Sequence, residues 1–241
     1  MNILIPMAGL GSRFSEAGYD VPKPLIEFHG KTMIQHAVDT LGVEGQLIFC
    51  VHADHCNEHG LDQKLLEFYP DCRIVVTDEL TDGPASTCML ARMWFENDDP
   101  LIMTNCDQYM MWNGSEFQSF LDETDADGVL VTYYTDVEHN SYAKVNDQGL
   151  VTLVREKEVI SRYSTNGIHY WKKGRSFCQS YDEMVRQDDR TNGEFYVAPS
   201  YNYLIERNFK IRIYDIDPSL HHATGTPDDL NRLLGILKDE A

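Results

Sequence analysis

Residues 3–24, ILIPMAGLGSRFSEAGYDVPKP, decide the fold of this chain. The apolar start, residues 3–5, is typical of a buried strand in a parallel sheet. A loop with Gly9 and Gly11 follows. Because glycine has no Cβ, backbone N–H groups in such a loop can approach an oxyanion closely. We therefore predict a strand followed by a phosphate-binding turn, in which Ala8, Gly9 and Gly11 bind a nucleotide.

Two cations follow the glycine turn. Arg13 offers a planar fork of donors suited to phosphate oxygens, and Lys23 offers a compact point charge. Pro22 and Pro24 flank the lysine, restrict the local φ angles and are expected to keep its segment extended. Strand, glycine turn and two cations together predict a cradle for a nucleoside triphosphate, with Arg13 and Lys23 as catalytic residues.

Two better-known phosphate loops are excluded. A dinucleotide fingerprint requires a third glycine where this chain has Phe14, and the pattern G-x-x-x-x-G-K-[ST] of Walker loops occurs nowhere. The chain instead has G-L-G-S-R-F, followed ten residues after the arginine by the lysine of P-K-P-L. This combination resembles the signature of the sugar-phosphate nucleotidyltransferases. Enzymes of that family join a nucleoside triphosphate to a sugar 1-phosphate or similar phosphomonoester and release pyrophosphate.

The composition narrows the classes of partner. Hydrophobic residues make up 42% of the 241 residues, which is enough for a full core. The formal net charge of −19 would repel nucleic acid and anionic lipid, so neither is an expected partner. The same charge would repel a nucleotide, which makes a local basic pocket or a bound divalent cation necessary.

The cysteines and the N-terminal residues bear on the cellular compartment in which the protein is expected. The six cysteines are scattered, with no C-x-x-C pair and no zinc spacing. The N-terminal residues, MNILIPMAG, have no basic region, and their apolar run is too short for a signal peptide or a membrane span. We expect reduced thiols and a cytoplasmic location.

Strands and helices alternate through the first half of the chain. The expected strands are 3–5, 46–51, 73–77 and 101–104, and the expected helices are 31–41, 60–69 and 84–94. This alternation predicts βαβ crossovers and a parallel sheet. Ligands of such sheets bind beyond the carboxyl ends of the strands, where the glycine loop and the turn at 105–107 both fall.

The second half is richer in β-structure. The expected strands are 128–134, 142–155 with a hairpin turn at 147–149, 166–171 and 210–216, and the expected helices are 173–186, 198–207 and 227–237, the last with Thr226 as N-cap. We predict an α/β, Rossmann-like three-layer fold with a mixed, mostly parallel central sheet. One domain, residues 1–241, would contain a nucleotide-binding half (1–127) and a small β-rich acceptor-binding half (128–241).

Asp107 directly follows the apolar strand LIMT and a short turn. A carboxylate at the end of a strand that faces a phosphate loop is well placed to hold Mg²⁺. The alternative is a turn-forming aspartate that bonds its own backbone. Gly83, before the helix at 84–94, would let backbone approach the base and sugar of the nucleotide. The resemblance supports both interpretations, because the family has a metal-binding aspartate after this strand and a G-T-A element at the position of Gly83.

The resemblance also implies the acceptor-binding residues. Glu156 and Lys157 match the family's Glu-Lys pair, in which the glutamate binds acceptor hydroxyls and the lysine binds the acceptor phosphate. The stretch 165–168, T-N-G-I, is similar to the family's N-T-G-I strand with its first two residues exchanged. Asn166 and Gly167 are therefore expected to bind the acceptor, although Thr165 could face it instead of Asn166.

The second metal ligand departs from the family pattern. The stretch 225–230, GTPDDL, resembles a closing element that many relatives precede, two residues earlier, with a metal-binding aspartate, and this chain has Ala223 there. Asp217 is our predicted second metal ligand, with Asp215 and His222 as alternatives.

The stretch 194–199, EFYVAP, resembles a segment of the subgroup that acts on capsule and other surface-polysaccharide precursors. Glu194 is expected to bind polar groups of the acceptor.

We therefore predict a Mg²⁺-dependent nucleotidyltransferase in which the acceptor phosphate attacks the α-phosphorus of a nucleoside triphosphate directly. The expected cofactor is Mg²⁺, and the expected partners are the triphosphate and a small phosphomonoester. Two alternatives remain open: a glycosyltransferase with a nucleotide-sugar donor and a catalytically silent nucleotide sensor. The D-x-D triplets at 125–127 and 215–217 do not follow the fourth strand, where a glycosyltransferase of related fold would be expected to carry one.

Overall fold

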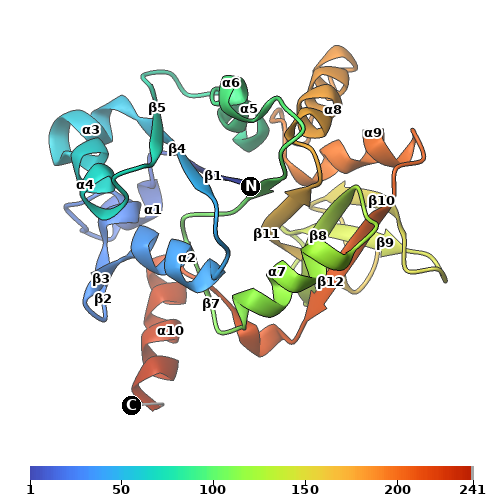
Figure 1. The fold of residues 1–241 in the computed structure, drawn as a ribbon. Helices are drawn as coiled ribbons and strands as arrows, with labels where there is room; N and C mark the ends of the chain where they lie inside the picture. Colours follow the sequence, from blue (N-terminus) through green and yellow to red (C-terminus); the bar gives the residue numbers. More distant parts are fainter. Residues whose placement is uncertain (240–241) are drawn as a thin grey trace.

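The computed structural model describes residues 1–239 of the chain (Figure 1). Within them, one central sheet has nine strands, in the order β10-β9-β11-β6-β1-β4-β5, and β8 pairs with both β11 and β12 beside this path. The strands are β1 (Asn2–Met7), β4 (Gln46–His52), β5 (Arg73–Thr77), β6 (Leu101–Met103), β8 (Gly128–Tyr134), β9 (Ser141–Val145), β10 (Val151–Glu156), β11 (Tyr163–Trp171) and β12 (Ile211–Ile216).

The strand directions divide the sheet. β6, β1, β4 and β5 are mutually parallel, whereas β11 joins β6 in antiparallel register and β8, β9 and β10 continue with antiparallel pairs. β12 returns parallel to β8. The mixed, Rossmann-like sheet predicted from the sequence is confirmed, and strands of both halves of the chain lie in one sheet.

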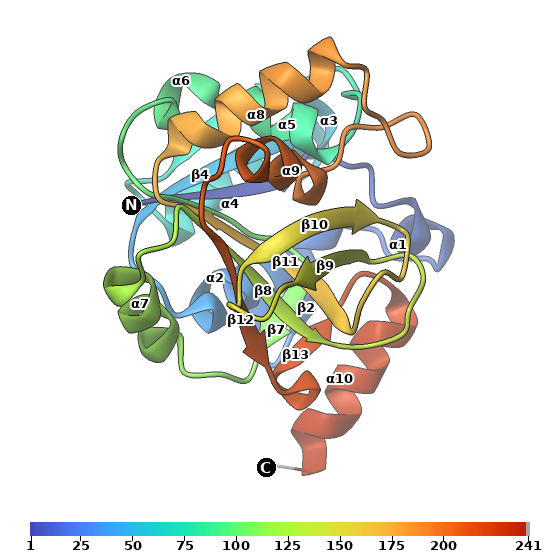
Figure 2. The same ribbon diagram turned by 90° about the vertical axis from the view of Figure 1, so that its right-hand side faces the viewer.

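Helices cover both faces of the sheet (Figure 2). On one face lie α5 (Pro84–Met89), α6 (Arg92–Phe95), α8 (Gly174–Arg186) and α9 (Tyr201–Ile205), and the other carries α2 (Met33–Leu41), α4 (Leu61–Phe68) and α7 (Gly114–Glu123). The short α3 (Ala53–His59) leads into α4. In residues 1–239, none of the helices has the length and apolar character needed to cross a membrane.

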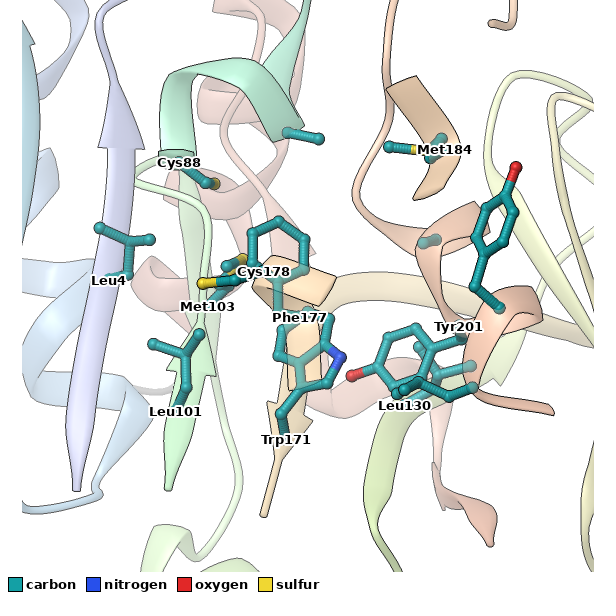
Figure 3. Packing of buried hydrophobic residues seen from close by; sticks show 14 of the residues in the cluster. Leu4, Cys88, Leu101, Met103, Leu130, Trp171, Phe177, Cys178, Met184 and Tyr201 are labelled. Atoms are coloured by element: carbon teal, nitrogen blue, oxygen red, sulfur yellow. The ribbon is translucent and has the colours of Figure 1, made fainter. Parts of the chain in front are cut away.

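Each face has its own hydrophobic core. On the first, Trp171 of β11 stacks on Tyr201 of α9 with ring centroids 4.7 Å apart and packs against Phe177 of α8 (Figure 3). Both rings of the stacked pair are fully buried. These aromatic contacts fix the helices of the second half on the sheet, because burying such large rings is strongly favourable.

A third cluster ties the end of the described chain to the glycine loop. Phe14 of α1 (Ser12–Glu16) is buried with Leu230 and Leu233 of α10 (Pro227–Asp239). Two small ribbons complete the fold: β2 (Glu27–Phe28) with β3 (Lys31–Thr32), and β7 (Gln108–Met110) with β13 (His221–Ala223).

Three predicted segments differ in form from the structure, and helices α1, α3 and α7 were not predicted. The helix expected at 84–94 divides into α5 and α6, because Leu90 and Ala91 make short i→i−3 hydrogen bonds that tighten the turn. The helix expected at 198–207 is a 3₁₀ turn, η2 (Ala198–Ser200), followed by α9. The lysine segment is not extended: Lys23 begins a 3₁₀ turn, η1 (Lys23–Leu25), closed by the Leu25 N–H on the Pro22 carbonyl.

Candidate active site

Lys23 and Asp107 meet at one edge of the sheet. β1 and β6 are adjacent and parallel, so the loops that follow them leave the same edge. Lys23 Nζ donates to Asp107 Oδ2 at 2.6 Å, and the two side chains are 21% and 23% exposed. Burial by itself lowers the pKa of Lys23, but the Asp107 carboxylate outweighs it and raises the pKa overall. The ammonium therefore stays charged.

Two cavities share a wall that includes Asp107. The first, about 350 Å³, is called the glycine-loop cavity and is lined by Ala8, Gly9, Gly11, Lys23 and Gly83 among others. The second, about 340 Å³, is called the strand cavity and is lined by Glu156, Asn166, Gly167, Tyr196 and His221 among others. Four residues line both: Pro6, Pro84, Asn105 and Asp107. A ligand in each cavity would therefore approach the other at Asp107.

The predicted nucleotide-binding residues come together in the glycine-loop cavity. Gly11 has a φ of 67°, which favours glycine, and caps α1. Gly83 has a φ of 114°, and a Cβ there would lie 2.7 Å from the Phe195 carbonyl oxygen. Both positions therefore require glycine, for backbone conformation and, at Gly83, for space as well.

Arg13 is the predicted catalytic residue that lines neither cavity. It lies in α1 and its side chain is exposed. Its charge is close enough to lower the pKa of Lys23 slightly against the larger effect of Asp107. The structure thus brings Lys23 and Asp107 into contact and leaves Arg13 at the outside of the loop.

The predicted acceptor residues of β10 and β11 line the strand cavity. The Ser141 hydroxyl donates to Glu156 Oε2, and burial raises the pKa of Glu156. Thr165 and Asn166 both line this cavity, so both residues that the sequence offered for binding the acceptor lie in its wall. Gly167, with φ 90°, lets Asn105 approach so closely that a Cβ would lie 2.1 Å from its Nδ2 atom.

Glu194 and Lys157 lie differently from what their sequence positions suggest. Glu194 lines the glycine-loop cavity, whereas Tyr196, two residues on, lines the strand cavity. Lys157 lines neither, but its Nζ lies 2.5 Å from the Tyr196 hydroxyl at the cavity wall. The structure therefore places Glu194 on the side of the predicted nucleotide.

A family model matches the part of the chain that carries the glycine loop, Lys23 and Asp107. The model of the MobA-like NTP transferase domain matches residues 3–161, which include the glycine loop, Lys23, Asp107 and Glu156. The chain belongs to the MobA-like NTP transferase family. The resemblance inferred from the glycine loop and the P-K-P-L segment is thereby confirmed.

Individual relatives of this chain agree with the family assignment. A mannose-1-phosphate guanyltransferase of Schizosaccharomyces pombe is 28% identical over 180 residues, which are 70% of this chain and 49% of that protein. The chain thus spans about half the length of that relative. The crystal structure of a nucleoside-diphosphate-sugar pyrophosphorylase from Vibrio cholerae superposes with a TM-score of 0.82 and 25% identity, covering 96% of this chain and 99% of the other. The inositol-1-phosphate CTP transferase of T. maritima has a TM-score of 0.74 at 17% identity, covering 97% of this chain and 92% of the other, and shows the shared fold.

The chain carries one carboxylate at the expected metal site, where many members of the family are expected to have two. Ala223 pairs with Gln108 in the β7–β13 ribbon, directly beside Asp107, and lines the strand cavity. Asp217 lines neither cavity, and its carboxylate accepts hydrogen bonds from the N–H and hydroxyl of Ser219. Asp215 likewise lies elsewhere, bonded to the Thr132 hydroxyl. The structure does not bring Asp217 or Asp215 to Asp107.

The donor set fits Mg²⁺ only in part. Within the described part of the chain, no group of three or more His, Cys, Asp or Glu side chains could hold a metal ion. Asp107 offers hard oxygen donors at the shared wall, and Mg²⁺ characteristically uses one or two carboxylates with water and substrate phosphates. The residues therefore fit a cation that arrives with a triphosphate, with Asp107 as its protein ligand.

Three residues of the strand cavity were missed in the sequence. Gln108 donates through Nε2 to Thr104 Oγ1 at 2.5 Å, and Oε1 has no partner in residues 1–239. His169 Nδ1 likewise has no partner there, and burial lowers the pKa of this histidine to about 3. Both side chains are more than nine-tenths buried. Tyr196 is the third; nothing in the sequence separates it from a core aromatic residue.

Proposed function

We propose that this NTP transferase joins a nucleoside triphosphate to a hydroxylated phosphomonoester, such as a sugar 1-phosphate, and releases pyrophosphate. The observation that carries the proposal is the pair of cavities with Asp107 at their common wall and Lys23, from the glycine-loop cavity, bonded to it. The triphosphate would occupy the glycine-loop cavity and the acceptor the strand cavity. In the reaction, an oxygen of the acceptor phosphate forms a bond to the α-phosphorus, and the bond from the α-phosphorus to the bridging oxygen breaks with its electron pair leaving on pyrophosphate.

The chain's own residues act by position and charge. Lys23 would leave Asp107 and stabilise the charge that grows on the α-phosphoryl group, while backbone N–H groups of the glycine loop hold the triphosphate. Asp107 would hold Mg²⁺, which supplies charge neutralisation at the phosphates. Arg13, from its exposed place on α1, would reach the departing phosphates. No covalent intermediate is needed; burial raises the pKa of the neighbouring Cys106 thiol to about 11, which disfavours a thiolate.

The strand cavity favours a hydroxylated acceptor over a quaternary ammonium such as phosphocholine. Gln108 Oε1 and His169 Nδ1 are buried polar atoms without a partner in residues 1–239, and such atoms are costly to leave unpaired. A hydroxyl can donate or accept, so it satisfies either end of the amide and either tautomer of the imidazole. A trimethylammonium group can do neither.

The remaining parts of the proposal follow the resemblance and the fold. We propose that the nucleotide-binding half (1–127) and the acceptor-binding half (128–241) form one catalytic domain, and that Glu156, Asn166 and Gly167 bind the acceptor. We also propose a cytoplasmic role in making precursors of surface polysaccharides. All six cysteines are free thiols in the structure, which supports a reducing compartment.

A pyrophosphate-release assay tests the function. The four common ribonucleoside triphosphates and dTTP are incubated with Mg²⁺ and a panel of sugar 1-phosphates, inositol 1-phosphate and phosphocholine. The proposal expects pyrophosphate with one base and one hydroxylated acceptor, and a loss of about 10²-fold or more with Asp107→Asn or Lys23→Met. Pyrophosphate release that does not depend on an acceptor, or turnover of a nucleotide sugar instead, would overturn it.

A further inference from the structure

Residues 194–196 connect the two cavities. The segment follows a tight turn in which Thr191 and Glu194 exchange backbone hydrogen bonds of 3.0 Å. Phe195 is buried, and its backbone N–H donates to the Asp82 carbonyl at 2.7 Å, while its carbonyl accepts from the Ala85 N–H at 3.0 Å. The segment is therefore fixed at both sides of Gly83, in the wall of the glycine-loop cavity.

Arg190 strengthens this anchor. Its guanidinium lies 4.1 Å from the Phe195 ring centroid, donates to the Gly193 carbonyl at 2.9 Å and pairs with Asp82 at 3.1 Å. The planar Arg190 guanidinium thus contacts the Phe195 ring, the Gly193 carbonyl and the Asp82 carboxylate together. The place of Glu194 and Tyr196 on either side of Phe195 is thus set by the fold.

Glu194 and Tyr196 meet across the anchored phenylalanine. Side chains two residues apart in extended chain lie on the same side, and the Tyr196 hydroxyl donates to Glu194 Oε2 at 2.5 Å. Because Glu194 lines the glycine-loop cavity and Tyr196 the strand cavity, this hydrogen bond spans the boundary between them.

Lys157 completes the chain of contacts. Its Nζ donates to the Tyr196 hydroxyl at 2.5 Å and lies 4.4 Å from the centroid of the same ring. The Lys157 backbone has a φ of 57°, which a lysine rarely adopts, and its N–H donates to the Asn140 carbonyl at 2.9 Å. Strained backbone of this kind persists where the surroundings determine it strongly, and it is concentrated at functional sites.

The protonation states of Lys157 and Tyr196 fix the direction of these two hydrogen bonds. The hydrogen bond to Tyr196 raises the pKa of Lys157, and burial together with Glu194 raises the pKa of Tyr196. Both groups therefore keep their protons at neutral pH. Lys157 donates to Tyr196, which donates to Glu194.

We propose that Tyr196 is a positioning residue for the transfer reaction: its hydroxyl, directed by Glu194, holds the Lys157 ammonium against the wall of the strand cavity and keeps it from pairing directly with the Glu194 carboxylate. This inference rests on the proposed function for what the lysine binds, the phosphate of the acceptor. Without the hydroxyl, lysine and glutamate would neutralise each other, and the acceptor phosphate would have to break an ion pair before binding.

A kinetic test separates positioning from a structural role. In Tyr196→Phe the ring remains and the hydroxyl is lost, so the KM for mannose 1-phosphate should rise about tenfold, the order expected for a hydrogen bond to a charged group, while the KM for the triphosphate changes less than about twofold. In a Lys157→Met background, Tyr196→Phe should add nothing, because the two residues act as one unit. Additive losses, or an equal rise in both KM values, would overturn the proposal.

A labelling test needs no substrate. Trace acetylation with acetic anhydride, read by mass spectrometry, gives the reactivity of Lys157 relative to the exposed Lys144. Without the hydroxyl, Lys157 would pair directly with the Glu194 carboxylate, which favours the charged ammonium, so the lysine pKa should rise by about one unit and its labelling should fall about tenfold in Tyr196→Phe. Tyr134→Phe, whose side chain is 63% exposed, is the matched control and should change nothing. Unchanged labelling in Tyr196→Phe refutes the inference, whereas wild-type protein that labels as expected but releases no pyrophosphate refutes only the proposed function.

Discussion

Replacing Lys23 by methionine separates two roles that the structure gives this lysine. In the absence of a ligand, its ammonium is 2.6 Å from the Asp107 carboxylate, which is the group that would hold Mg²⁺. Lysine and cation therefore compete for the same oxygen. Lys23→Met keeps the length of the side chain and removes the charge, so it should bind metal better and react more slowly.

The expected gain in metal affinity follows from the strength of the Lys23–Asp107 ion pair. At 2.6 Å the Coulomb attraction is about 6 kcal/mol with an effective dielectric constant of about 20, but desolvation of both groups offsets most of it. Net values for hydrogen bonds between charged groups are about 1.5–3 kcal/mol, and each side chain here is only about one-fifth exposed. Mn²⁺, used in place of Mg²⁺, should therefore bind the nucleotide-free Lys23→Met variant about 10- to 100-fold more tightly than wild type.

Isothermal titration with Mn²⁺, or the loss of free-Mn²⁺ signal in electron paramagnetic resonance, measures the affinity without turnover. Lys23→Met combined with Asp107→Asn is the control and should lose the gain. Turnover of the single variant should fall about 10²-fold in the same preparations. Metal affinity that stays level or weakens in Lys23→Met would show that the lysine does not compete with the cation at Asp107.

Three further predictions follow from the same geometry. Ala223→Asp places a second carboxylate beside Asp107 in the β7–β13 ribbon, and should tighten Mn²⁺ binding to the nucleotide-free protein by about tenfold, measured by the same titration; no change would place residue 223 outside the metal site. Gly83→Ala introduces a Cβ 2.7 Å from the Phe195 carbonyl oxygen at a φ of 114°, so it should lower the free energy of unfolding by about 1–3 kcal/mol and raise the KM for the triphosphate. Gly235→Ala is the control: its Cβ has open space in α10, and it should raise the free energy of unfolding by up to about 1 kcal/mol. Urea unfolding measures both variants. The free energy of unfolding should fall as the pH drops from about 6.5 toward 3, because His169 takes up a proton in the unfolded chain but not in the folded chain, where its pKa is about 3. The contribution of His169 to this loss is about 1.4 kcal/mol per pH unit. A His169→Phe variant in which the free energy of unfolding depends on pH as steeply as in wild type would contradict this assignment.

Most of the fold could be predicted from the sequence because local patterns determine it. β1 and the glycine loop were readable because an apolar run and glycines at fixed spacing both act over a few residues. The N-cap at Thr226 was equally local; the Asp229 N–H donates to its hydroxyl at 3.1 Å. The break between α5 and α6 was not readable, since nothing in residues 84–94 except packing distinguishes one helix from two.

The site was only partly predictable, for reasons of distance along the chain. Asp107 was named because it follows a strand, and Lys23 because it follows the glycine loop; the loops after parallel neighbouring strands leave the same edge of the sheet and bring such residues together. Asp217 was chosen to replace the carboxylate absent at Ala223, but whether it reaches Asp107 depends on the path of the chain after β12, which no local pattern gives. Tyr196, Gln108 and His169 acquire their importance from partners or orphaned atoms that only the three-dimensional arrangement defines.

The proposed transfer takes place where the two cavities meet. The most direct test is ³¹P nuclear magnetic resonance of wild-type protein with Mg²⁺, the triphosphate and the phosphomonoester that the panel selects. We expect pyrophosphate and a new diphosphate ester in equal amounts, with the α-phosphorus of the triphosphate retained in the ester and neither product in Asp107→Asn. Inorganic phosphate or a free nucleoside monophosphate in place of the ester would contradict the proposed transfer.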